Sequence, residues 1–281
     1  MTLADKLLLV SRVKPVVNGA VEFVSSTPMT ITPNYDNAGI TLQYSLDTVN
    51  WVNIVAKAVT PSANIIYFRG STTGTKSLFT NTNVNNAWVF TGATNLEAIG
   101  NINMLIQDVL GGDIEDIPLA TNCYNSMFYN CRSLVTAPAL PATTLANYCY
   151  NSMFYNCRSL VTAPALPATT LATSCYNNVF RNCTKLTTAP ALPATTLAPS
   201  CYDSMFRDCT SLKLSTILTG IYDTAYRIPT TGTGTTAEDA LSNMFTETGG
   251  TFKGTPEINT TYYTENTPKK KKKNVLQYRR K

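Results

Sequence analysis

Residues 123–146 read CYNSMFYNCRSLVTAPALPATTLA, and residues 149–172 repeat these letters without a change. A third copy begins at Cys175 and a shortened fourth copy at Cys201, so the unit recurs every 26 residues. A fixed period of this size is typical of a solenoid, in which a unit buries its apolar face only against the next unit. The repeat therefore decides the fold expected for the middle of the chain.

Within one unit the apolar side chains predict a short helix. Cys123, Met127, Phe128 and Cys131 fall at positions i, i+4, i+5 and i+8, which lie on one face of a helix. The letters SLVTAPAL that follow predict an extended segment, because their prolines exclude a helix there. Each unit is thus predicted to hold a helix, a strand and a proline-rich return, which makes the repeat region an α/β leucine-rich-repeat solenoid.

The segments on either side of the repeats predict further modules. Residues 21–94 contain short alternating runs such as ITLQYSLD at 40–47, which predict a small all-β sandwich. Residues 1–20 are expected to form a short helix or lead-in, with leucines spaced for one face and Pro15 ending it. Residues 95–120 resemble a degenerate first unit, so the solenoid is predicted over 95–212.

A C-terminal cap is expected over 213–267. It should contain a last helix at 240–250, where ALSNMFTETGG repeats the spacing of the unit, and a strand within 251–264. Residues 268–281 are expected to be a disordered basic tail, because like charges repel and few apolar residues compensate.

The cysteines lie eight residues apart within each unit. A helix rises roughly 12 Å over eight residues, whereas a disulfide needs Cα atoms within about 7 Å. The spacing therefore predicts reduced, buried thiols that stack as small apolar side chains. The expected core ladder consists of Cys123, Cys131, Cys149, Cys157, Cys175, Cys183, Cys201 and Cys209.

The net charge of +5 comes from the C-terminal end of the chain. Residues 269–281 hold six Lys and two Arg with no acid, so the rest of the chain carries +5 − 8 = −3. Only this tail could contact the phosphates of nucleic acid; an acidic protein surface is the other candidate, and an incidental coding tract is a third explanation. Its basic residues are Lys269, Lys270, Lys271, Lys272, Lys273, Arg279, Arg280 and Lys281.

The sequence lacks the residues of common catalytic sites. It contains no histidine, which excludes Ser-His-Asp and Cys-His pairs and His-containing zinc sites. Gly232, Gly234 and Ala237 match G-x-G-x-x-A, but no apolar strand precedes them, and Glu238 and Asp239 would repel a pyrophosphate. We expect no enzyme activity, no cofactor and no metal site.

The runs MFYNCRSL, MFRNCTKL and MFRDCTSL, joined by APALPATTLA, resemble the BspA-type leucine-rich repeats. A YFRG motif at 67–70 and the segment AYRIPTTGTGTTA at 225–237 extend the resemblance. It implies a right-handed leucine-rich coil and a role in adhesion or recognition, on gut anaerobes or in the bacteriophages that infect them.

The sequence shows no export signal and no apolar run long enough to span a bilayer, which favours a phage virion protein assembled in the host cytoplasm. Such a protein would sit on the capsid surface or tail and would be oligomeric there. Two alternatives stay open. One is a secreted or cell-surface adhesin, and the other is a structural spacer whose tail binds nucleic acid or an acidic virion protein.

The leucine-rich pattern also predicts a partner-binding face. Alternation along the strand, with its leucine inward, points Thr136 and Pro138 outward, together with their mates in the next two units, Thr162, Pro164, Thr188 and Pro190. This ladder could meet another virion protein or a host-surface protein or glycan. The alternative is a plain solvated sheet with the partner bound elsewhere.

Overall fold

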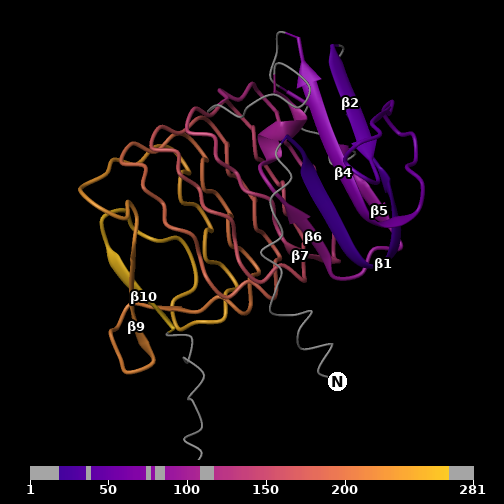
Figure 1. Cartoon of the computed structure of the whole chain (residues 1–281). Helices are drawn as coiled ribbons and strands as arrows, with labels where there is room; N and C mark the ends of the chain where they lie inside the picture. Colours follow the sequence, from indigo (N-terminus) through magenta and orange to yellow (C-terminus); the bar gives the residue numbers. More distant parts are fainter. Residues whose placement is uncertain (1–18, 36–38, 74–76, 80–85, 108–116, 266–281) are drawn as a thin grey trace, which may run out of the picture.

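The computed structural model describes residues 19–35, 39–73, 77–79, 86–107 and 117–265. The helix predicted near the N-terminus and the basic tail lie outside the described residues. Within the described residues there is no α-helix, and no helix is long and apolar enough to cross a membrane. The predicted α/β solenoid is therefore wrong: the units stack, but they are built from turns and short strands (Figure 1).

The N-terminal part forms a sheet that continues into the first repeat. Its strand order is β3-β2-β4-β1-β6-β7, and β5 pairs with the second half of β1. The predicted sandwich is thus wrong, because these strands share one sheet instead of two packed sheets. The strands are β1 (Val21–Thr32), β2 (Ile40–Ser45), β3 (Val52–Asn53), β4 (Ala63–Thr72), β5 (Val89–Thr91), β6 (Leu96–Ile99) and β7 (Leu134–Thr136).

The junction between sheet and solenoid is made by β6 and β7. These strands pair in parallel, with Leu96 opposite Leu134, whereas β1 pairs antiparallel with both β4 and β6. A short 3-10 helix, η2 (Ile102–Leu105), follows β6 and is capped at its N-terminus by Asn101, whose side chain accepts a hydrogen bond from the Asn103 N–H. The sheet and the repeats therefore share a continuous hydrophobic core.

Aromatic residues fill the core at this junction. The ring of Phe23 lies 5.9 Å from Phe68, 6.1 Å from Trp88 and 6.3 Å from Phe128 of the first unit. Trp88 is buried and its indole N–H donates to the Asn34 carbonyl at 2.8 Å. Trp88 thus packs in the core and satisfies its one polar group, as a buried tryptophan usually does.

The segment predicted as a helix is a chain of turns in every unit. Every fourth residue has a positive φ, as at Asn122 (63°), Ser126 (59°) and Asn130 (62°) in the first unit. Such left-handed residues interrupt an α-helix. Asparagine adopts this conformation more readily than most residues, and the sequence supplies it at several of these positions.

Backbone hydrogen bonds explain how these turns are held. In the first unit the N–H groups of Met127 and Tyr129 donate to carbonyls three residues earlier. The N–H groups that alternate with them point to the next coil: Ser126 donates to the Asn151 carbonyl and Phe128 to the Met153 carbonyl, both at 2.9 Å. Half of the donors in each turn segment therefore depend on a neighbouring unit.

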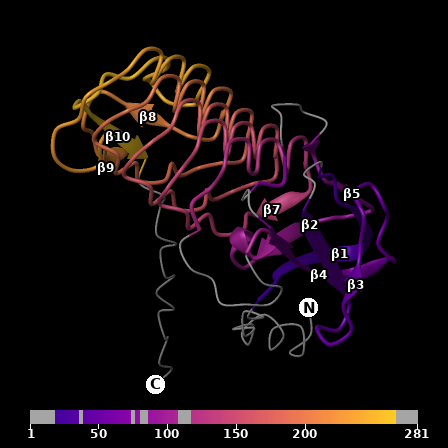
Figure 2. The same cartoon turned by 90° about the horizontal axis from the view of Figure 1, so that it is seen from above.

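Identical side chains stack along the solenoid. Phe128, Phe154, Phe180 and Phe206 follow one another at 5.5–5.7 Å with nearly parallel rings, and a buried tyrosine ladder that begins at Tyr124 runs beside them. These rings are fully buried. Seen from above, the coils lie side by side between the N-terminal sheet and the C-terminal strands (Figure 2).

The C-terminal part adds one more turn segment and a small sheet. The helix predicted at 240–250 is wrong, because Asp239, Asn243 and Glu247 have the same positive φ pattern as the repeats, and Phe245 stacks on Phe206 at 5.5 Å. The closing sheet has the order β8-β10-β9. Its strands are β8 (Leu214–Ser215), β9 (Tyr222–Arg227) and β10 (Thr261–Glu265).

Candidate interaction surfaces of the solenoid

The threonines of the predicted partner-binding face are exposed. Thr136, Thr162 and Thr188 form a line of parallel bridges, one threonine per coil. Pro138 is buried, however, and Pro164 and Pro190 are half-buried, so the prediction that Pro138 faces outward is wrong.

The backbone beside Pro138 explains its burial. The neighbouring Ala139 pairs with the N-terminal sheet: its N–H donates to the Gly100 carbonyl at 2.9 Å, and its carbonyl accepts from the Ile102 N–H. The first coil is thus covered at this point, whereas the matching Pro164 and Pro190 are half-buried. The alternation of inward and outward side chains expected from the sequence therefore stops where β7 ends, at Thr136.

A second threonine ladder was not anticipated. Thr144, Thr170, Thr196 and Thr235 are exposed and joined by parallel bridges. The repeated letters ATTL held a signal for it, because a hydroxyl residue recurs there in each unit. This ladder extends the threonine surface beyond the residues predicted.

A third surface lies over the turn segments, and the sequence reasoning missed it. One position of the unit is Tyr129, Tyr155, Arg181 and Arg207 in successive coils, and we call these four residues the turn ridge. The rings of Tyr129 and Tyr155 stack at 4.8 Å, and the Arg181 guanidinium lies 5.6 Å from the centre of the Tyr155 ring. The available signal was that the units differ here while the adjacent apolar positions repeat.

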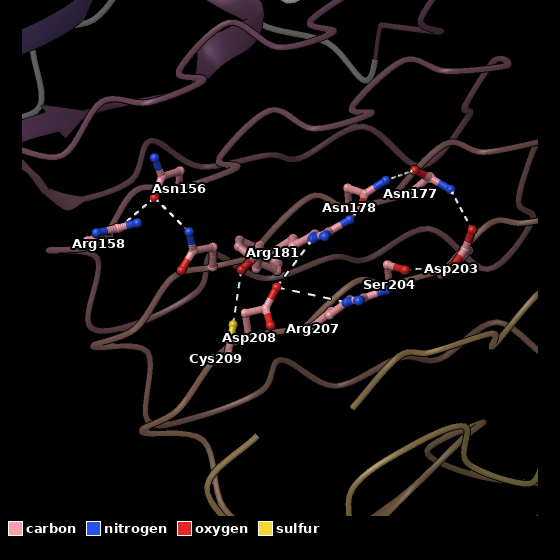
Figure 3. Close-up of polar contacts among 12 residues, drawn as sticks. Asn156, Arg158, Asn177, Asn178, Arg181, Asp203, Ser204, Arg207, Asp208 and Cys209 are labelled. Atoms are coloured by element: carbon pink, nitrogen blue, oxygen red, sulfur yellow. Dashed lines mark hydrogen bonds and ion pairs between the residues drawn. The ribbon is translucent and has the colours of Figure 1, made fainter. Parts of the chain in front are cut away.

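Amide side chains run beside the turn ridge. Asn156 donates to Asn130, and Asn182 donates to the Asn156 side-chain oxygen at 2.9 Å. The same oxygen accepts from Arg158 Nε at 2.6 Å (Figure 3). This ladder holds the side chains of successive coils in fixed positions.

The ladder ends in a carboxylate. Asp208 lies 3.4 Å from Arg181 Nε and 3.9 Å from Arg207 Nε, so one acid is shared by two guanidinium groups (Figure 3). Near it, Asn177 donates to Asp203 at 3.2 Å, and the Ser204 hydroxyl donates to the same carboxylate group at 2.8 Å. These ion pairs and hydrogen bonds fix the side-chain positions at this end of the turn surface.

The charges of the repeats are all on the turn side. Over 123–212 there are five basic and two acidic residues, a net charge of 5 − 2 = +3, and the strand and proline-rich segments carry none. The five bases are Arg132, Arg158, Arg181, Lys185 and Arg207. The turn side of the repeats is therefore cationic, although residues 1–268 as a whole carry a net charge of −3.

A cavity opens where this surface meets the N-terminal sheet. It has a volume of about 420 Å³ and is lined by residues 87–90 and 129–133. Phe90, Tyr129 and the exposed Arg132 are among its walls, and Phe90 stacks on Phe128 at 5.8 Å. An aromatic wall beside a guanidinium is suited to a ligand with both an apolar face and a negative charge.

The eight cysteines are buried and free. They form two ladders, and in the second ladder Cys157, Cys183 and Cys209 donate to the carbonyls of Phe128, Phe154 and Phe180 at 3.0–3.1 Å. Burial raises the pKa of Cys131 and of Cys209 to about 12. The thiols therefore stay protonated and unreactive near neutral pH.

The glycines at 232 and 234 have a structural role. A side chain at Gly234 would approach the Thr195 carbonyl to 2.9 Å, and the Gly234 N–H donates to Asn259. Arg227 donates to the Gly232 carbonyl, which ties this loop to β9. Among the described residues no group of three or more Cys, Asp or Glu could hold a metal ion.

The comparisons with known proteins give no relative for this chain: no protein-family model, curated protein or solved structure matches it.

Proposed function

We propose that this chain is a recognition protein without enzyme activity, and that the turn ridge and its neighbouring arginines bind a negatively charged glycan. The observation that carries the proposal is the separation of roles within one unit. The inward positions repeat the same apolar ladders, while the outward turn positions change from tyrosine to arginine along a regular scaffold.

The chemistry of the surface supports this ligand class. Aromatic rings pack against the apolar faces of sugar rings, amide ladders exchange hydrogen bonds with hydroxyl groups, and guanidinium groups pair with carboxylate or sulfate groups. Tyr129, Tyr155 and Arg181 follow one another at the spacing of the coils. A chain molecule with repeated groups would meet one such side chain after another.

Binding to immobilised heparin and polygalacturonate, measured by surface plasmon resonance with a variant that ends at Glu265, tests the proposal. This variant removes the basic tail, which would bind polyanions by itself. Replacing Arg158 and Arg181 with Gln should reduce affinity by tenfold or more. Replacing Tyr155 with Ala should also reduce it.

The matched control changes Thr136, Thr162 and Thr188 to Val and should leave the affinity unchanged. Retained binding in the arginine variant would contradict the proposal. Lost binding in the threonine variant would move the recognition surface to the predicted threonine ladder.

We further propose, from the resemblance of the repeats, that the protein is carried on a bacteriophage particle. Immunogold electron microscopy with an antibody to residues 123–212 would test this on producing cells and on purified particles. Label on particles is the expected result. Label confined to cell envelopes would overturn it and favour a bacterial adhesin.

A spacer function is the second candidate, and the observation that favours it is the run of basic residues at 269–281. In this case the solenoid separates two partners, and the tail binds nucleic acid or an acidic virion protein. Removing 269–281 would then abolish incorporation into particles, whereas the arginine variant would be incorporated normally.

A further inference from the structure

The backbone hydrogen bonds between the turn segments of successive coils run in one direction. In each turn segment alternate N–H groups donate to carbonyls of the next coil, as Tyr124 does to Cys149 at 2.7 Å and Ser204 does to Ser242 at 2.8 Å. The last turn segment, 239–247, follows this pattern, and in the described part of the chain no further coil lies beyond it. Its forward-pointing N–H groups therefore need other acceptors, from the cap, from water or from a ligand.

The cap supplies acceptors for only part of this end. The N–H of Asn243 donates to the Thr255 hydroxyl at 2.9 Å, and the N–H of Phe245 donates to the Gly254 carbonyl at 2.8 Å. The N–H groups of Asp239 and Leu241 hold the equivalent positions one turn earlier, and no residue in the described part of the chain accepts from them.

These two residues line a cavity. It has a volume of about 430 Å³, and residues 236, 237 and 239–242 form one wall and residues 255–258 the other. The open end of the hydrogen-bond ladder thus coincides with a space between the last coil and the cap. An acceptor placed there would continue the ladder.

The backbone of residues 239–242 offers donors at this end, because its carbonyls already accept hydrogen bonds. The carbonyls of Ala240 and Ser242 accept from the preceding coil, and the carbonyls of Asp239 and Leu241 accept from Ser242 and Met244. The same end of a second copy would therefore bring donors against donors. The occupant must carry carbonyl or other acceptor groups of its own.

The charge of the cavity walls further restricts which ligand can bind there. Asp239 and Glu257 are in its walls and Glu238 is exposed beside it, while no Lys or Arg lines it. A free phosphate or carboxylate would be repelled. An extended peptide with basic side chains offers both the carbonyls and the opposite charge.

We propose that the basic C-terminal segment of this chain, residues 269–281, binds at this open end, with its carbonyls accepting from the N–H groups of Asp239 and Leu241 and its lysines facing Asp239 and Glu257. The segment follows β10, which ends at Glu265, seven residues after Ile258 of the cavity wall. The 16 residues from 266 to 281 span roughly 50 Å when extended, which is enough to return along β10.

Hydrogen exchange followed by NMR tests the proposal on the full chain and on a variant ending at Glu265. The amides of Asp239 and Leu241 should exchange at least tenfold faster in the shortened variant. Those of Asn243 and Phe245 have acceptors in the cap and should not change. Adding the peptide NTPKKKKKNVLQYRRK should restore the slow exchange.

Matched charge changes identify the site of peptide binding. Glu257→Lys should weaken binding of this peptide to the shortened variant by tenfold or more, while Glu247→Lys, in the same coil but outside the cavity walls, should not. The proposal would be overturned if the amides of Asp239 and Leu241 exchange equally fast in the full chain and the shortened variant. It would also be overturned if Glu257→Lys does not weaken peptide binding. Neither outcome depends on glycan binding at the turn ridge, which is tested without the tail.

Discussion

At the scale of single residues, the buried thiols link protonation to stability. Burial raises the pKa of Cys131, Cys201 and Cys209 to about 12, whereas an exposed cysteine titrates near pH 8.5. Between these values the unfolded chain loses protons that the folded chain keeps, so the free energy of unfolding should fall as the pH rises from about 9 towards 12.

Urea unfolding at several pH values between 7 and 10.5 checks this expectation. A variant with Cys131, Cys201 and Cys209 changed to Ala should be less stable overall but lose less stability with rising pH. If the free energy of unfolding falls equally with pH in the two proteins, other groups, such as the tyrosines, cause the loss of stability at alkaline pH.

Residues with positive φ give a second prediction at this scale. Glu247 is exposed and has φ 59°, a conformation that costs about 1–2 kcal/mol for a residue with a Cβ. Glu247→Gly should therefore raise the free energy of unfolding by about 0.5–1 kcal/mol, after the entropic cost of glycine. Thermal unfolding followed by circular dichroism measures the change.

Glu238 provides the control, because it is exposed in the same coil without a positive φ. Glu238→Gly should lower stability. If both changes destabilise the protein equally, the positive φ of Glu247 does not cost stability.

At the scale of elements, two glycines join the last coil to the closing sheet. A Cβ at Gly249 would lie 2.1 Å from the Thr210 carbonyl, and one at Gly250 would lie 2.1 Å from the Leu214 carbonyl. Gly249→Ala should force the backbones apart and cost about 1–3 kcal/mol. Gly220→Ala, where nothing lies within 4 Å of the added atom, should have almost no effect. Differential scanning calorimetry compares the two variants, and equal melting temperatures would contradict the close packing described for the cap.

At the scale of the whole molecule, the stability of the solenoid should depend on the number and phase of its coils. Deleting residues 149–174 removes one whole unit and brings Tyr124 against Tyr176, so the ladders should re-form. This variant should unfold cooperatively in urea at a lower midpoint. Deleting only residues 149–161 removes half a period and places apolar ladder positions opposite polar ones, so it should prevent cooperative unfolding. Similar midpoints for the two deletions would show that the coils are not held by their register.

An element could be predicted from the sequence where local interactions form it, and could not where its hydrogen bonds reach a distant part of the chain. The strands near ITLQYSLD and in SLVTAPAL were predictable because alternation along a strand is local, and β2 and β7 lie within these segments. The turn segments were not, because the spacing of Cys123, Met127 and Cys131 by four residues suits a helix and a chain of four-residue turns equally. The turn ridge was missed for the same reason: a helix would have placed Tyr129 and Tyr155 differently.

The sequence by itself determined the period, the identity of the stacked side chains, the absence of histidine and the placement of charge within the unit. The tertiary structure decided the backbone of the turn segment, the burial of Pro138 and the open end beside Asp239. The physical reason is that half of the N–H groups in each turn segment find their acceptors in the next coil. A partner 25 residues away, or a covering strand such as β6, leaves no mark in the local pattern of one unit.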